Sequence, residues 1–274
     1  MGKLTAEFFR NLFKIPFFRK KYFGFHKHIF APYQLFSGVK KEISYRGNIQ
    51  LKVHLDDWIQ QQLYFLGDYE KPEIDYLSAF LKPGNVFIDI GANIGLFSLN
   101  ASKIVGNNGK VYAFEAFPPN YKQCKENILL NNFQNIIVEN KAISSQNSTM
   151  EILYNEKDKN IGMASAFLKD FTSKEIVESI TLDQYSSNQN ITKIDLIKID
   201  IEGGEFDAIL GMTKVLTELK PQVLIEINHK TLQDSGHSET EIINLLSKFN
   251  YKIIKKLSGD EQSYNAVFGF SELN

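Results

Sequence analysis

The stretch Val86-Phe87-Ile88-Asp89-Ile90-Gly91-Ala92-Asn93-Ile94-Gly95 decides the fold expected for this chain. Residues 86–90 are apolar apart from one acid and show little alternation, which is typical of a strand buried on both faces of a parallel sheet. Gly91 and Gly95 permit positive φ and let a ligand approach the backbone closely. Residues 96–105 then read as a helix. The stretch therefore predicts an α/β protein with a ligand bound at the end of this strand.

A second apolar strand, residues 110–115, ends in an acid, Glu115, twenty residues after Gly95. A carboxylate at that place accepts hydrogen bonds from the ribose hydroxyls of a nucleoside. The turn reads Asp-x-Gly-Ala-Asn-x-Gly and lacks the glycine triplet that admits a pyrophosphate. This favours an adenosine ligand without phosphates, S-adenosylmethionine being the common one. A nicotinamide-dependent oxidoreductase is the enzyme alternative, and no Tyr-x-x-x-Lys pair on an expected helix supports it.

Strands and helices alternate along the rest of the chain, which predicts a doubly wound, mostly parallel sheet. Residues 251–256 and 264–270 should close it as an antiparallel pair, giving seven strands. Residues 144–179 interrupt the rhythm and read as an insertion near the ligand crevice. The other expected strands are 135–138, 194–201 and 222–228, and the expected helices are 72–81, 95–105, 119–131, 205–218 and 238–248.

Several separated blocks of the sequence closely resemble the FkbM family of S-adenosylmethionine-dependent methyltransferases. They are Asp89-Ile90-Gly91-Ala92-Asn93-Ile94-Gly95, Phe114-Glu115-Ala116, Thr181-Leu182-Asp183 and Asp200-Ile201-Glu202-Gly203-Gly204-Glu205. The resemblance runs from about Gly67 to the C-terminus. It implies a class I methyltransferase-like sheet and O-methylation of a small metabolite or glycan, as in polysaccharide biosynthesis. Pro118 follows Glu115 later than the family pattern has it, which affects the expected path of that loop.

The acids that end the strands should surround one crevice, because the carboxyl ends of parallel strands lie at one edge of the sheet. Glu115 is expected to bind the ribose. Asp89 is expected to order the turn amides or to meet the methionine ammonium. The remaining residues expected to bind the cofactor are Gly91, Asn93 and Gly95 in the turn, Asn140 and Ala142 near the adenine, Asp200, and Glu70, which alternatively caps the helix that follows it.

Methyl transfer to an alcohol needs a base or a metal, because the pKa of the hydroxyl lies far above 7. Asp200 and Glu202 stand two residues apart at one strand end, and Glu226 and His229 end the next strand. Asp200 or His229 could act as the general base. Alternatively, Asp200, Glu202 and Glu226 could hold Mg²⁺ or another hard cation. The metal-free version is favoured, because clusters of oxygen ligands are easily over-interpreted from sequence.

Residues 1–36 carry seven basic residues and one acid, so their net charge is +6, whereas the rest of the chain carries −7. They also hold eleven aromatic residues. The expected helical face comprises Leu4, Phe8 and Leu12 with Phe9 and Phe13. This segment and a hairpin are expected to form an appendage over residues 1–70, before a methyltransferase domain over 71–274. The segment could cap that domain or contact an anionic membrane or lipid carrier.

The single cysteine, Cys124, can form no internal disulfide, which suits a reducing compartment. No apolar run approaches the eighteen residues that span a bilayer. We therefore expect a cytoplasmic location, with peripheral contact at the inner membrane face as an addition. The acidic remainder disfavours nucleic acid as a partner. A non-catalytic scaffold that binds the cofactor is the non-enzyme alternative, and the acids at the strand ends argue against it.

Overall fold

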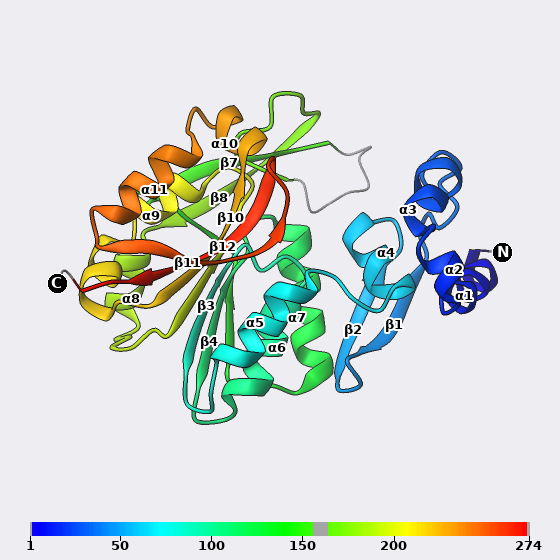
Figure 1. The fold of residues 1–274 in the computed structure, drawn as a ribbon, viewed down its shortest axis with the longest axis horizontal. Helices are drawn as coiled ribbons and strands as arrows, with labels where there is room; N and C mark the ends of the chain where they lie inside the picture. Colours follow the sequence, from blue (N-terminus) through cyan, green and yellow to red (C-terminus); the bar gives the residue numbers. More distant parts are fainter. Residues whose placement is uncertain (1, 156–163, 273–274) are drawn as a thin grey trace. The chain divides into compact units, whose positions relative to one another are not determined.

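The computed structural model describes residues 2–155 and 164–272 (Figure 1). The chain divides into two compact units, with the boundary between Lys71 and Pro72. Within the described residues, no helix is both long enough and apolar enough to cross a membrane.

The second unit is built on a seven-stranded sheet with the order β11-β12-β10-β9-β3-β4-β5. The five strands from β10 to β5 are parallel, whereas β12 runs antiparallel to both of its neighbours. This confirms the predicted seven-stranded sheet and its antiparallel final strand. The order reverses between β3 and β9, so the carboxyl ends of these two strands form the crevice. The strands are β3 Val86–Ile90, β4 Lys110–Phe114, β5 Ile136–Glu139, β9 Leu196–Ile199, β10 Gln222–Asn228, β11 Tyr251–Gly259 and β12 Ser263–Phe270.

Helices cover both faces of this sheet (Figure 1). On one face lie α5, α6 and α7, and on the other lie α8, α9 and α11. Both layers bury apolar side chains against the strands, as a doubly wound sheet requires. The helices are α5 Lys71–Phe80, α6 Leu96–Val105, α7 Pro118–Asn131, α8 Leu182–Asn188, α9 Glu205–Leu210, α10 His229–Asp234 and α11 Glu239–Ser247.

The helix predicted over residues 205–218 is wrong in one respect: it is broken. Helix α9 ends at Leu210, and a π-helical turn follows at Val215–Leu219. Gly211 packs against another segment there, since a Cβ on it would lie 2.0 Å from the Ser144 carbonyl oxygen. The Asp183 carboxylate accepts hydrogen bonds from the backbone amides of residues 214 and 215 and so begins the second turn.

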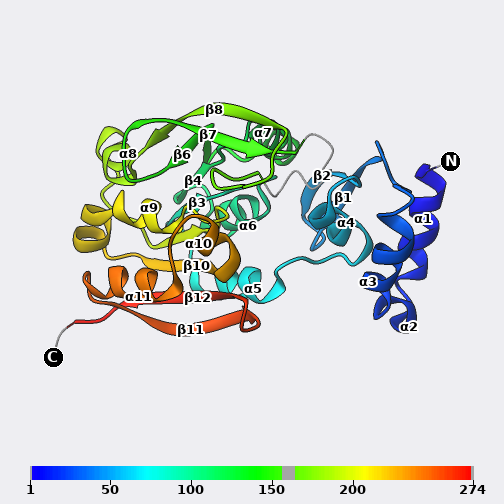
Figure 2. The same ribbon diagram turned by 90° about the horizontal axis from the view of Figure 1, so that it is seen from above.

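Part of the expected insertion and strand β6, which directly precedes it, form a separate three-stranded sheet with the order β6-β8-β7 (Figure 2). Its strands are β6 Lys141–Ile143, β7 Ser148–Tyr154 and β8 Ser173–Ile180. Strand β7 pairs antiparallel with β8, and β6 pairs parallel with it. Residues 156–163 of the insertion lie outside the described residues.

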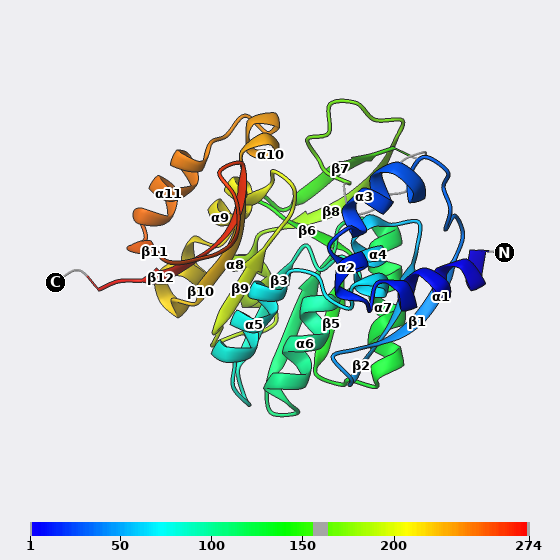
Figure 3. The ribbon, with the colours of Figure 1, turned by 45° about the vertical axis from the view of Figure 1, so that its right-hand side comes forward.

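The N-terminal unit combines short helices with the predicted hairpin (Figure 3). The two acids before helix α4 have different partners. Asp57 caps it by accepting from the Gln60 amide at 2.9 Å, while Asp56 accepts from the Gly38 amide. The elements are α1 Gly2–Leu12, α2 Pro16–Arg19, α3 Tyr22–Phe25, a π-helical turn His26–Phe30, β1 Lys40–Tyr45, β2 Ile49–His54 and α4 Trp58–Phe65.

Aromatic rings form the core of this unit. They bury only some of the apolar residues predicted to share one face of the first helix. Phe9 packs edge to face on Phe30, with ring centroids 4.9 Å apart, and Phe13 is fully buried. Leu4 and Phe8 are instead exposed, by 77% and 62%. At 100° per residue, the five apolar residues of the predicted face span about half of the helix circumference. The aromatic core contacts only part of that arc, so the rest of the face stays exposed.

Candidate cofactor and catalytic site

The turn after β3 ties together the ends of three neighbouring strands. The amides of Gly91 and Ala92 donate to the carbonyl of Phe114, the last residue of β4, at 2.9 and 3.0 Å. The Asp200 amide, after β9, donates to the carbonyl of Ile90 at 3.0 Å. The acids predicted for one crevice, at positions 89, 115 and 200, therefore stand on segments that are hydrogen-bonded to one another.

Gly91 is required for this packing. Its φ is +85°, and a Cβ on it would lie 1.8 Å from the carbonyl oxygen of Asp200. The sequence predicted close approach of a ligand to this glycine, but the backbone after β9 occupies that side of it. Gly95 has φ +88° and faces the Cys124 sulfur, 2.9 Å from where a Cβ would lie. Both glycines therefore serve the packing of the turn.

Glu115 is 7% exposed and accepts two backbone hydrogen bonds. Its Oε2 accepts from the Asn93 amide at 2.7 Å, and its Oε1 accepts from the Phe117 amide at 2.9 Å. The loop therefore closes on Glu115 even though proline comes late in it. A carboxylate has about four acceptor sites, and these amides use two, which leaves capacity for two ribose hydroxyls.

Burial raises the pKa of Glu115 to about 7, with the two amides acting to lower it and the charges of Asp89 and Asp200 raising it. In the unfolded chain the pKa stays near 4.5. The folded protein therefore binds this proton more tightly, and the free energy of unfolding should fall as the pH rises between those two values. The expected contribution of Glu115 is roughly 2–4 kcal/mol over that window.

We expect the melting temperature of the ligand-free protein to be lower at pH 8 than at pH 5.5, measured by differential scanning calorimetry. Glu115→Gln should flatten part of that slope, because its amide does not titrate. Glu261→Gln, in the exposed turn between β11 and β12, is the control and should leave the slope unchanged. If the melting temperature depended on pH equally in wild type and Glu115→Gln, the raised pKa of Glu115 would be contradicted.

Asp89 is fully buried and only half satisfied. Its Oδ2 accepts from the Ser98 hydroxyl, on the first turn of α6, at 2.5 Å. Within residues 2–155 and 164–272, its Oδ1 has no hydrogen-bond partner. Burial raises the pKa of this carboxyl. An unsatisfied buried carboxylate is costly, so this site fits a ligand that brings a hydrogen-bond donor or a positive charge, as a methionine ammonium does.

Asp200 forms an ion pair with a lysine that the sequence reasoning missed. Lys198 lies on β9 with its side chain only 4% exposed, and its Nζ is 2.8 Å from Asp200 Oδ2. The same ammonium lies 4.6 Å from the ring centre of Phe97. A lysine inside the run Leu196–Ile199 was the available signal, since buried charges in proteins are paired.

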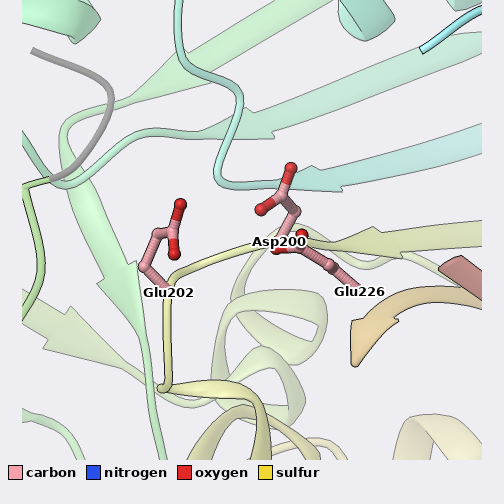
Figure 4. A group of neighbouring side chains, drawn as sticks. All are labelled: Asp200, Glu202 and Glu226. Atoms are coloured by element: carbon pink, nitrogen blue, oxygen red, sulfur yellow. The ribbon is translucent and has the colours of Figure 1, made fainter. Parts of the chain in front are cut away.

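Asp200, Glu202 and Glu226 each offer one carboxylate oxygen within 4.8 Å of the others (Figure 4). Asp200 and Glu202 stand on the segment that follows β9, and Glu226 stands on β10. Glu226 accepts from the Ser263 hydroxyl at 3.0 Å. Oxygen donors at this spacing suit a hard divalent cation, while Lys198 already supplies one positive charge to Asp200. The three predicted residues are therefore brought together.

Glu205 shapes the segment that carries Asp200 and Glu202. It is fully buried, and its Oε1 accepts from the amides of Ile201 and Gly203 at 3.1 and 3.2 Å. Burial raises its pKa to about 7. Glu202 has a positive φ of 53°, a strained conformation that these bonds help to hold. Glu205 is the last residue of the sequence block 200–205, and no role was predicted for it.

His229 lies in a separate hydrogen-bonded group. Its Nε2 is 2.8 Å from Glu239 Oε2, and Glu239 Oε1 accepts from the Tyr264 hydroxyl at 2.5 Å. The Tyr264 hydrogen bond is the largest of the effects that hold the pKa of Glu239 below its usual value. These bonds give His229 a structural role as a hydrogen-bond partner of Glu239, and its role as a base stays a prediction.

The residues expected near the adenine have structural partners. The amide nitrogen of Asn140 donates to the carbonyls of Glu115 and Ala116 at 2.9 and 2.8 Å, and Ala142 is buried on β6. Glu70 belongs to the N-terminal unit and has φ 46°. Contacts of these three residues with a cofactor stay predictions.

Comparison with known proteins gives consistent matches. A family model for the methyltransferase FkbM domain matches residues 89–253. The chain is similar to methyltransferase sdnD of Sordaria araneosa, with 27% identity over 174 residues, which are 53% of this chain and 67% of that protein. It is also similar to the crystal structure of methyltransferase FkbM from Methylobacillus flagellatus KT, with 17% identity and a TM-score of 0.44 over 78% of this chain and 55% of that one. A SAM-dependent methyltransferase from Aquifex aeolicus has 17% identity and a TM-score of 0.47, over 79% and 95% of the two chains.

The family match covers more than half of the chain and runs from Asp89, near the end of β3, to Ile253, near the beginning of β11. It therefore includes the glycine turn, Glu115 and the acidic segment after β9. The site residues fit the cofactor of that family, because Glu115 retains acceptor capacity and Asp89 keeps an unsatisfied oxygen. The chain belongs to the FkbM methyltransferase family, and it is an S-adenosylmethionine-dependent methyltransferase.

Proposed function

We propose that the protein transfers a methyl group to a hydroxyl of a glycan or small metabolite. The observation that carries this proposal is the carboxylate cluster of Asp200, Glu202 and Glu226 at the strand ends. An alcohol becomes a competent nucleophile only when its proton is removed in the reaction, and such a cluster provides an acceptor for that proton. The bound cofactor supplies the electrophilic methyl group.

We assign Asp200 as the general base that accepts the proton of the acceptor hydroxyl. Lys198 holds Asp200 Oδ2 at 2.8 Å, which orients the carboxylate and leaves Oδ1 for the acceptor hydroxyl. Glu205 fixes the neighbouring backbone, so the carboxylate does not have to be ordered when substrate binds. Glu115 would bind the ribose, and Asp89 would meet the ammonium of the methionine part.

The alternative to a general base is a divalent cation held by the same three carboxylates. The observation that favours it is their spacing, with one oxygen of each within 4.8 Å of the others. Mg²⁺ there would lower the pKa of the acceptor hydroxyl and so replace the general base. The Lys198 ammonium reduces the need for such a cation at Asp200. The two versions therefore differ in whether turnover and binding require added Mg²⁺.

We infer that the acceptor contacts the part of the insertion that borders the acidic segment. The Ser165 hydroxyl donates to the carbonyl of Glu202 at 2.7 Å, and the Phe167 ring approaches Gly203, 3.3 Å from where a Cβ would lie. Lys169 forms an ion pair with Asp234 at 2.6 Å. These contacts fix residues 164–169 beside the carboxylates, where they can select the acceptor. A glycan acceptor, and with it a role in polysaccharide biosynthesis, is supported by the sequence resemblance.

The test is isothermal titration calorimetry of S-adenosylmethionine and S-adenosylhomocysteine, with and without Mg²⁺. We expect micromolar binding to the wild type and a loss on the order of 10²-fold in Glu115→Ala, because two charge-assisted hydrogen bonds disappear. Glu115→Gln keeps the shape and should lose less. Glu261→Ala, in the exposed turn between β11 and β12, is the control and should bind normally.

Binding that tightens with Mg²⁺ would favour the metal version of the site. Folded protein that binds neither ligand would overturn the proposal, and NAD would then be titrated to test the oxidoreductase alternative. Binding without transfer to any of a panel of sugars and sugar nucleotides would favour the non-catalytic scaffold. A cytoplasmic location is part of the proposal and is supported by the single, buried Cys124.

A further inference from the structure

The N-terminal unit concentrates exposed apolar side chains in a short stretch of sequence. In the described part of the chain thirteen large hydrophobic side chains are exposed, and seven of them fall within residues 4–33. Single exposed hydrophobic residues are ordinary on protein surfaces, but such a concentration marks an interaction surface. The seven are Leu4, Phe8, Ile15, Phe17, Phe23, Ile29 and Tyr33.

Two of these side chains form a ridge on helix α1. Leu4 and Phe8 are one turn apart and so share a face, whereas Ala6 and Phe13 are fully buried on the other side. The core of the unit is already filled by its other aromatic rings, of which Phe30 is 2% exposed. The ridge therefore contributes nothing to the core of the unit that carries it.

Exposed basic residues occur in the same stretch of sequence as these side chains. Five exposed basic residues lie in the same stretch: Lys14, Arg19, Lys20, Lys21 and Lys27. The Lys21 ammonium lies 4.1 Å from the ring centre of Phe17, so charge and aromatic ring occur together. The stretch holds one acid, Glu7, and an ion pair with Lys41 at 2.6 Å neutralises it. The surface is thus both apolar and cationic.

We propose that residues 4–33 form a surface that docks on an anionic lipid bilayer. Apolar side chains that stand out from a helix enter the boundary between headgroups and acyl chains, while lysines and arginines beside them bind anionic headgroups. The charge complementarity selects an anionic membrane as the occupant. This inference does not depend on the acceptor or on the chemistry of the active site.

The proposal is tested by co-sedimentation of the full chain with vesicles of phosphatidylcholine alone and of phosphatidylcholine with 30% phosphatidylglycerol. We expect binding to the anionic vesicles that weakens as salt rises from 50 to 500 mM, since salt screens the lysines. Lys20→Glu with Lys21→Glu should weaken the partition on the order of tenfold or more. Leu4→Ser with Phe8→Ser should weaken it by a similar factor.

Matched variants in the second unit serve as controls. Lys248→Glu with Lys252→Glu reverses two exposed lysines there, and Ile176→Ser removes a hydrophobic side chain that is 68% exposed on β8. Both should bind vesicles as the wild type does. Trp58 is the only tryptophan of the chain and stacks on Tyr22, so an unchanged emission spectrum shows that the N-terminal unit of each variant is folded.

Absence of binding to anionic vesicles would overturn the proposal, as would equal binding to both compositions. Anionic binding that survives in the Leu4→Ser, Phe8→Ser variant would also overturn it. Self-association of the wild type that this variant abolishes, measured by light scattering without vesicles, would assign the surface to a second copy of the chain instead.

Discussion

Asp200→Asn should lower kcat on the order of 10²- to 10⁴-fold, which is the range for removing a positioned general base. The side chain keeps its size, but an amide cannot accept the proton of the hydroxyl. It also removes the negative charge that Lys198 faces at 2.8 Å inside the sheet. Since Glu115 and Asp89 are unchanged, the dissociation constant for S-adenosylhomocysteine should stay within a few fold of the wild-type value.

The measurement combines release of S-adenosylhomocysteine, with the acceptor found by screening sugars and metabolites, and calorimetric binding of that product. Asp195→Asn is the matched control, because Lys193 and Asp195 repeat the spacing of Lys198 and Asp200 at the opposite end of β9 and form an ion pair at 3.0 Å. Its turnover should remain within about twofold. Equal activity of Asp200→Asn and wild type would exclude Asp200 as the base, and a loss of product binding would assign it to the cofactor.

The parallel sheet could be predicted because its strands are buried on both faces and read as uninterrupted apolar runs. Residues 86–90 and 222–228, for example, have the same bounds in the structure as in the prediction. The break after α9 could not be predicted in the same way. It results from the approach of Gly211 to Ser144, a contact between segments far apart in the sequence. Local periodicity does not register such contacts.

The division of the first helix has a similar explanation. Both Phe8 and Phe9 look equally apolar in the sequence, and adjacent residues on a helix point about 100° apart. Only the position of Phe30 and its neighbouring rings decides that Phe9 packs inward while Phe8 stays exposed. The sequence could therefore predict an amphipathic segment, but not which of its hydrophobic residues the unit buries.

In the site, the acids were predictable and their partners were not. Asp200, Glu202 and Glu226 follow from the rule that ligands bind at the carboxyl ends of parallel strands, and the structure brings them together. Lys198 pairs with the Asp200 carboxylate, and Glu205 accepts from a backbone amide of the segment between them. These contacts depend on the folded backbone, so the sequence alone did not reveal them. At Gly91 the sequence predicted the close approach of a ligand, whereas the group that approaches it in the structure is the backbone carbonyl of Asp200.

Gly91→Ala should therefore be among the most damaging single changes in the chain. A methyl group at this position would lie 1.8 Å from the carbonyl oxygen of Asp200, so the turn after β3 and the segment after β9 must separate. That movement strains the hydrogen bonds that join the strand ends and displaces the Asp200 carboxylate, which we propose as the general base. We expect a loss of roughly 3–5 kcal/mol in the free energy of unfolding and no measurable binding of S-adenosylhomocysteine.

Gly84→Ala separates this clash from the backbone effect. Gly84 has the same φ of +85° as Gly91, and nothing lies within 4 Å of the place where its Cβ would be. Alanine at Gly84 should therefore cost only the left-handed conformation, about 1–2 kcal/mol, and leave cofactor binding intact. Urea unfolding followed by far-ultraviolet circular dichroism gives the two losses. Equal losses would mean that the segment after β9 yields freely to the added methyl group, and then Gly91 would be required for its φ alone.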